Sequence, residues 1–72
     1  AEAAEFKILP DFKHTGVPLK MLKIKKDYIV AGIIRKRKAV IPGGDDVILA
    51  DDHVIVIAAG KTLHSLSDIF ED

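Results

Sequence analysis

The residues best suited to chemistry in this chain are four consecutive cations, Arg35-Lys36-Arg37-Lys38. They follow an apolar run with the length and the Val and Ile content of a β-strand. By strand alternation, Arg35 is expected to share a face with Ile29, Ala31 and Ile33. An arginine at the end of an apolar stripe can hold a phosphate or a carboxylate by paired hydrogen bonds. The sequence therefore predicts an anion contact at Arg35, with a carboxylate of the chain itself as the alternative partner.

The other three cations of this run predict a different kind of surface. Lys36, Arg37 and Lys38 are expected at a solvated hairpin tip, and a nucleic-acid patch is the alternative for a short basic run. Modules that stack bases need aromatic side chains on the sheet. The chain has only one Tyr and three Phe, and none stands beside the basic run. Nucleic-acid binding is therefore the runner-up function, as a small basic module, and not the leading one.

The residues that resemble metal ligands or nucleophiles are predicted to have structural roles. Four aspartates occupy two predicted turns: Asp45, Asp46, Asp51 and Asp52. They lack the ligand spacing of an EF-hand loop, and Asp is common in turns for local reasons. The three histidines have no metal-ligand spacing on one element. A Ser, His and Asp group on the last predicted helix lacks the cleft that a nucleophile needs, so neither a metal site nor a catalytic site is expected.

Length and charge limit the possible classes. Seventy-two residues make one domain, and a chain this small has marginal stability alone. Without cysteine it has no disulfide to support it, which fits a cytoplasmic origin. The net charge is zero, but residues 13–38 carry +8 and residues 39–72 carry −6. This segregation indicates either a solvated surface with separate basic and acidic regions or a basic patch for an anionic ligand.

The elements that position these residues are read from apolar patterning. Strands are predicted over residues 5–9, 28–35, 38–41 and 54–59, with a short helix starting at Pro18 and another after an N-cap at Thr62 that buries Leu63. The hairpin turn at Lys36-Arg37 is expected to be longer or bulged, because tight turns favour Gly or Asn. The predicted fold is α+β, in the order β-α-β-β-β-α, with a mixed or antiparallel sheet.

The predicted strands are apolar on both of their faces. Ile29 to Ile34 and Val54 to Ala59 are almost wholly apolar, so both sides of the sheet need cover. Two short helices are enough for one side only. The sequence therefore predicts a homodimer in which a second copy covers the other side.

Four segments together resemble a known family. They are residues 14–22 (HTGVPLKML), residues 33–35 (IIR), residues 40–42 (VIP) and residues 52–56 (DHVIV). Their order and spacing resemble the TrkA C-terminal domain, also called RCK_C, of prokaryotic potassium uptake and channel systems. The chain departs from the family pattern in two turns. Lys36-Arg37 stands where Gly or Asn is usual, and Asp51 stands where Gly is usual.

The resemblance implies a non-catalytic regulatory domain that dimerises. It also implies a parent chain with a Rossmann-like nucleotide-binding domain, from which this chain is excised, working at the cytoplasmic face of a potassium transporter membrane subunit. The family's effector, where there is one, is a cyclic dinucleotide or a divalent cation bound between subunits, and no other cofactor is expected in this domain. Carried onto this chain, the implied ligand-binding residues are Ile33, Arg35, Ile41 and Pro42.

Overall fold

The computed structural model describes residues 1–60 and 62–71. Its elements follow the predicted order, but both helical segments are short 3-10 turns. The elements are β1 (Glu2–Lys7), η1 (Leu19–Met21), β2 (Tyr28–Arg35), β3 (Lys38–Val40), β4 (His53–Ala58) and η2 (Leu66–Ile69). The first strand begins three residues and ends two residues earlier than the predicted 5–9, because residues as far back as Glu2 pair with β4.

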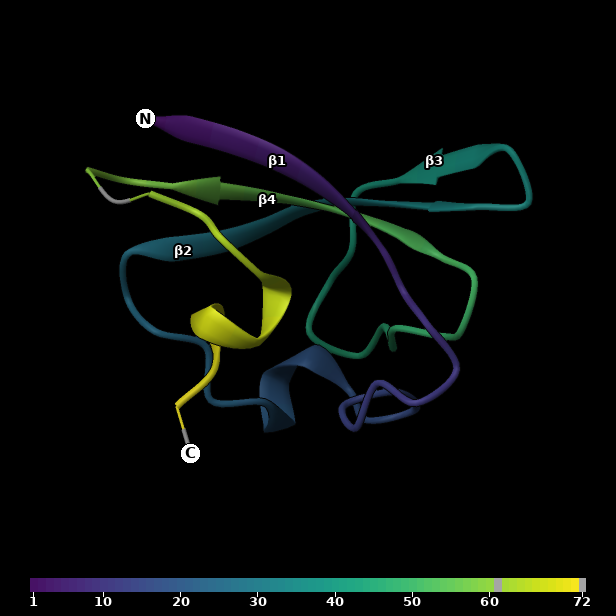
Figure 1. Ribbon diagram of the computed structural model, residues 1–72. Coiled ribbons are helices and arrows are strands. Elements are labelled where there is room, and N and C mark those ends of the chain that lie inside the picture. Colours follow the sequence, from purple (N-terminus) through teal and green to yellow (C-terminus); the bar gives the residue numbers. More distant parts are fainter. Residues whose placement is uncertain (61, 72) are drawn as a thin grey trace.

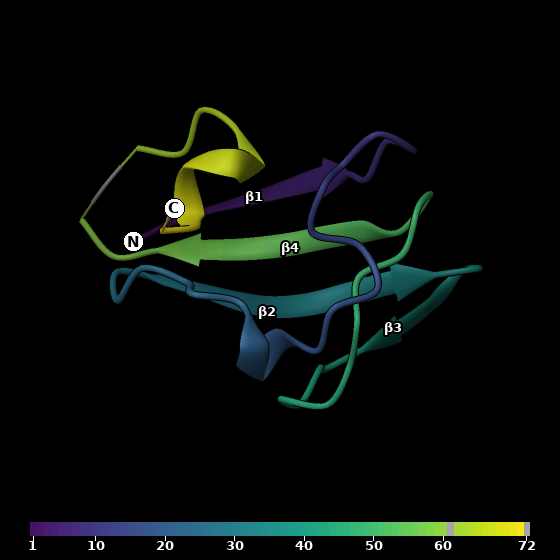
Figure 2. The same cartoon turned by 90° about the horizontal axis from the view of Figure 1, so that it is seen from below.

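The four strands form one sheet in the order β1-β4-β2-β3, and every neighbouring pair is antiparallel. The sequence predicted either a mixed or an antiparallel sheet, and the sheet is antiparallel. Figure 1 shows η1, η2 and the connecting loops on one side of the sheet, and Figure 2 shows the strand order from that side. The opposite side of the sheet carries no helical turn of the described chain.

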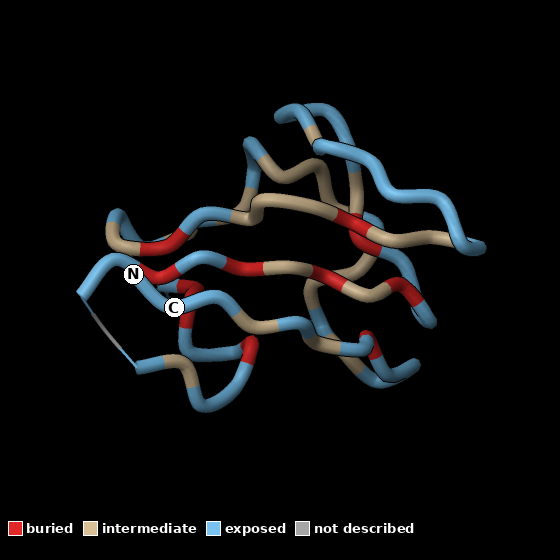
Figure 3. The backbone as a smooth tube through the Cα atoms, turned by 90° about the horizontal axis from the view of Figure 1, so that it is seen from above, coloured by how far each residue is buried: buried red, intermediate tan, exposed pale blue. Residues whose placement is uncertain are grey.

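The core lies between the sheet and these turns and loops. Along β4 the side chains of Val54, Val56 and Ala58 are buried, while those between them are less buried, as alternation requires. Figure 3 shows the same alternation of buried and more exposed positions along the strands. The remaining buried apolar residues come from all parts of the chain: Ile8, Tyr28, Ile33, Ile48, Leu66, Ile69 and Phe70.

A β-bulge in β2 decides which side chains reach the core. The pairing of β2 with β4 shifts between Val30 and Gly32, so that Ala31 is an extra residue in the ladder. The expectation that Arg35 shares a face with Ile29 is therefore wrong. Ala31 is the extra residue itself, so it has no place in the regular alternation of faces. Ile33 and Arg35 do lie on one face, which is the covered one, and Ile29 lies on the uncovered face.

The hairpin turn is tighter than predicted. Arg35 pairs directly with Lys38, which leaves a two-residue turn with φ of 50° at Lys36 and 67° at Arg37. Positive φ at both central residues is the type I′ pattern that suits the twist of a hairpin. The sheet geometry thus imposes a left-handed backbone on two residues that do not favour it.

The helical segments are also shorter than predicted. Pro18 precedes η1 with an extended backbone, and Leu22 is extended again after one turn. At the other end, η2 begins after Ser65 and not after Thr62, so Leu63 is outside it. The Ser65 amide donates to Asp68 Oδ2 at 3.3 Å, which gives this part of the Ser-His-Asp group a capping role.

Candidate anion-binding site

The bulge brings Arg35 to the covered side of the sheet, next to the start of β4. There its guanidinium makes a two-point contact with Asp52: Nε donates to Oδ1 at 2.9 Å and Nη2 donates to Oδ2 at 2.7 Å. Nη2 also donates to the Val47 carbonyl at 2.8 Å. This is the alternative that the sequence left open, in which Arg35 pairs with a carboxylate of the chain.

Asp52 is the buried partner in this contact. Its side chain is 2% exposed, whereas that of Arg35 is 39% exposed. The Leu49 amide donates to Asp52 Oδ2 at 2.9 Å. The hydrogen bond from Arg35 holds the pKa of Asp52 below its usual range against the opposing effect of burial, and the same bond raises the pKa of Arg35.

A cavity of about 310 Å³ lies beside this pair, under the β2–β3 hairpin. Its lining consists of Ile33, Arg35, Lys36, Lys38, Val40, Asp46 and Val47. Three of these residues are apolar, three are cationic and one is acidic. An apolar wall with cations at its rim suits a small organic anion, because the wall takes up the body of the ligand and the rim pairs with its charge.

The four residues implied by the family resemblance separate into two groups. Ile33 and Arg35 line the cavity. Ile41 follows β3, is 89% exposed and does not line the cavity, and Pro42 lines a different hollow with Lys25 and Lys26. A single protomer therefore brings two of the four together.

The sequence interpretation missed most of the cavity lining. Val40, Asp46 and Val47 come from β3 and the loop after it, and only the fold brings them beside Arg35. Asp52 was interpreted as a turn residue, although its position directly before a buried strand was a usable signal. The backbone at Asp51 has φ of 72°, which explains why Gly is usual at this position in the family that the sequence resembles.

Two of the aspartates predicted to lie in turns make local contacts there. Asp46 Oδ2 accepts from the Gly43 amide at 2.6 Å, which closes the turn locally, and Asp45 pairs with Lys20 at 2.7 Å on the surface. Within residues 1–60 and 62–71, no cluster of three or more potential metal ligands is present.

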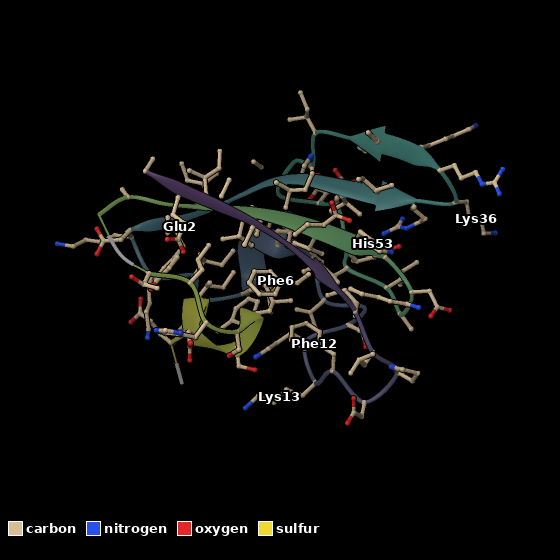
Figure 4. The ribbon with its side chains drawn as sticks, turned by 45° about the horizontal axis from the view of Figure 1, so that its top comes forward. Glu2, Phe6, Phe12, Lys13, Lys36 and His53 are labelled. Carbon is tan, nitrogen blue, oxygen red and sulfur yellow. The ribbon has the colours of Figure 1, made fainter. Side chains whose placement is uncertain are left out.

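The uncovered face of the sheet is apolar near one end of its strands. Ile29 and Ile57 are cross-strand partners that are 63% and 38% exposed, and Ala3 is the neighbour of Ile57 on β1. His53 and Glu5 lie nearer the other end of this face, where Nδ1 and Oε2 are 2.7 Å apart. Figure 4 shows His53 with the side chains of the sheet, on the opposite side from Phe12.

Comparison with known proteins gives one consistent family. The sequence matches the model of the TrkA-C domain over residues 3–71. It is similar to the Trk system potassium uptake protein trkA homolog 1 of Methanosarcina mazei, with 35% identity over 66 residues, or 92% of this chain and 16% of that protein. For the TrkA homolog of Pyrococcus abyssi the identity is 33% over 72 residues, covering 99% of this chain and 32% of that protein.

A solved structure supports the same family. A chain described as "Structure of RCK domain with cda" superposes with a TM-score of 0.71 at 27% identity, over 83% of this chain and 84% of that one. By contrast, the chain spans less than a third of the length of the two potassium uptake proteins named above. In the described part of the chain, no helix has the length and apolar character needed to cross a lipid bilayer.

Proposed function

Because the chain belongs to the TrkA-C domain family, we propose that it is a non-catalytic regulatory domain that pairs with a second copy and binds a small anionic effector. We place it in a potassium uptake system, because the relatives are Trk system potassium uptake proteins. In the parent chain it would work with a Rossmann-like nucleotide-binding domain, at the cytoplasmic face of the membrane subunit.

The uncovered sheet face supports the pairing. The accessible surface of 4910 Å² exceeds the roughly 4,400 Å² expected of a folded monomer of 7.9 kDa. An excess of this kind fits a small domain with one apolar face left open. A second copy seated on Ile29 and Ile57 would bury them, since a two-fold interface places the same patch of each subunit in contact.

The observation that best supports the effector proposal is the cavity beside Arg35. Its volume of about 310 Å³ is at the small end for ligand pockets. Each protomer would therefore hold part of a ligand, and a two-fold ligand such as a cyclic dinucleotide would use both copies. Ile41 and Pro42 join the site in this proposal only if the second copy brings them to it.

The cavity also decides which variant tests the effector. Arg35→Ala is a poor probe, because it leaves the buried Asp52 carboxylate without its cation as well as removing a ligand contact. Val40 lines the cavity and is half-exposed, so Val40→Glu adds an opposing charge without filling the core. Lys23→Gln is the matched control, since Lys23 is exposed and is not in the cavity lining.

Titration calorimetry with cyclic di-AMP and with ATP tests the proposal. We expect one of these nucleotides to bind the wild type and Lys23→Gln, and binding to be lost in Val40→Glu. Binding that survives in Val40→Glu would move the anion to another surface, and absence of binding by both nucleotides would reject the effector. Sedimentation equilibrium tests pairing separately, and a wild type that stays monomeric at micromolar concentration would reject it.

A further inference from the structure

The tip of the β2–β3 hairpin is a cationic surface that the proposed effector does not fully use. We define the hairpin tip as Lys36, Arg37 and Lys38, all three of which are exposed. Within the described residues, none of the three makes an ion pair. We propose that the hairpin tip binds the surface of an anionic lipid bilayer, an inference that rests on the proposed role in a membrane transport system.

The fold gives no reason for cations at these positions. Lys36 and Arg37 occupy the left-handed backbone of a type I′ turn, where Asn and Gly fit best. Side chains of other kinds are strained there. The sheet fixes this backbone, but it does not require Lys and Arg in it, and residues held in strained backbone often mark a functional surface. The two charges are therefore better explained by a binding partner than by the stability of the turn.

The shape of the hairpin tip indicates a partner with an extended, flat surface. Figures 1 and 2 show the hairpin projecting beyond the rest of the sheet, and Figure 4 places Lys36 at its outer end. Arg37 is not part of the cavity lining, unlike Lys36 and Lys38. The projecting end of the hairpin gives Arg37 no cavity for a small anion, but the tip can lie against a flat surface with many negative charges.

Charge complementarity favours the lipid surface over the transporter itself. Cytoplasmic loops of membrane proteins carry an excess of Lys and Arg, so they would repel the tip. The cytoplasmic leaflet is negatively charged and attracts basic segments close to it. Arg35 adds little to this attraction, because the Asp52 carboxylate already neutralises it.

Nucleic acid is the less suitable partner for three cations. Binding to a duplex depends on neutralising its phosphates and weakens steeply with salt, so three cations alone give little affinity at physiological salt. A domain held at the membrane by its partners meets the leaflet at high effective concentration, where a few charges are enough. The proposed dimer would add a second tip.

Vesicle flotation at low salt tests the proposal, with vesicles of equal parts phosphatidylglycerol and phosphatidylcholine. The probe variant is Lys36→Asn/Arg37→Gly, which removes two charges and suits the turn, so a misfolded protein cannot explain lost binding. We expect binding to fall about 30-fold, which is about 2 kcal/mol at 1.4 kcal/mol per tenfold change. The control Lys23→Gln/Lys25→Gln removes the same charge elsewhere and should bind as the wild type does.

Three results would overturn the inference. They are wild-type binding that is equal on pure phosphatidylcholine vesicles, an equal loss in the control variant, and tighter binding to a DNA duplex than to the anionic vesicles under the same conditions. Calorimetry and sedimentation on the same wild-type protein report on the effector and on pairing. A failure of the lipid proposal is thereby separated from a failure of the proposed function.

Discussion

Replacing Arg35 with alanine tests how far the domain depends on one buried carboxylate. Of the three hydrogen bonds that the Asp52 carboxylate accepts from described residues, the substitution removes two and leaves the Leu49 amide. Removing one partner of a buried ion pair costs about 3–5 kcal/mol. Because Arg35 is 39% exposed, water can reach the gap, so we expect the lower end, about 3 kcal/mol.

A loss of that size is large for this chain. A domain of 72 residues has a free energy of unfolding of roughly 5 kcal/mol or less. In urea unfolding followed by circular dichroism, the unfolding midpoint of Arg35→Ala should therefore move to a low urea concentration. A double-mutant cycle with Asp52→Ala should give a coupling free energy of about 1.5–3 kcal/mol. Single losses under about 1 kcal/mol with no coupling would show that the pair is not formed in solution.

The pH dependence gives an independent check on the same pair. The hydrogen bond from Arg35 lowers the pKa of Asp52 in the folded protein, so the pair stabilises the fold above the unfolded-state pKa. This contribution is lost as the pH falls through the lower, folded pKa. In Arg35→Ala the buried carboxylate has no cation, and burial then raises its pKa. The difference in stability between wild type and variant should therefore shrink on acidification, and a constant difference would refute this reasoning.

Five further variants, at four places in the chain, test other parts of the structure. Lys36→Asn/Arg37→Gly should raise the free energy of unfolding in urea by about 1–2 kcal/mol, and a decrease would contradict the type I′ turn. Asp51→Val should lower it by about 1–2 kcal/mol while Asp51→Gly changes it by about 0.5 kcal/mol or less, and equal effects would show that positive φ is unimportant there. Ile33→Asp should leave the chain unfolded by circular dichroism, because Ile33 is buried, and a wild-type melt would contradict that burial. Ile57→Glu should leave the monomer folded but dissociate the proposed dimer in sedimentation, and an intact dimer would exclude this face as its interface.

The strand order along the chain could be predicted because apolar runs are long and separated by clear turn residues. The burial of Ile33 was predictable for the same reason. The bulge was not, because strict alternation was assumed through Ala31-Gly32. A glycine inside a strand is a recognised sign of a bulge, and here it would have corrected the face of Ile29.

The contacts and the turn that could not be predicted from the sequence depend on which strands pair in the folded sheet. Arg35 and Asp52 are neighbours only because β2 and β4 are adjacent, and the chain between them gives no local sign of it. The tight turn was unpredictable because the sheet forces Lys36 and Arg37 into a conformation that their own preferences oppose. The weak helical segments illustrate the reverse case, in which a short apolar periodicity is overridden by packing against the sheet.

The strand order has a consequence for how the chain reaches its fold. β1 precedes the other strands in the chain, yet among the described residues it pairs with β4 alone, with Lys7 opposite His53 and Glu2 opposite Ala58. The β2–β3 hairpin closes over two residues, whereas β1 must wait for nearly the whole chain. Until β1 docks, one edge of β4 stays open to pairing with another chain. In refolding followed by pulsed hydrogen exchange, amides of β1 should become protected after those of the hairpin, and earlier protection of β1 would show that another route is taken.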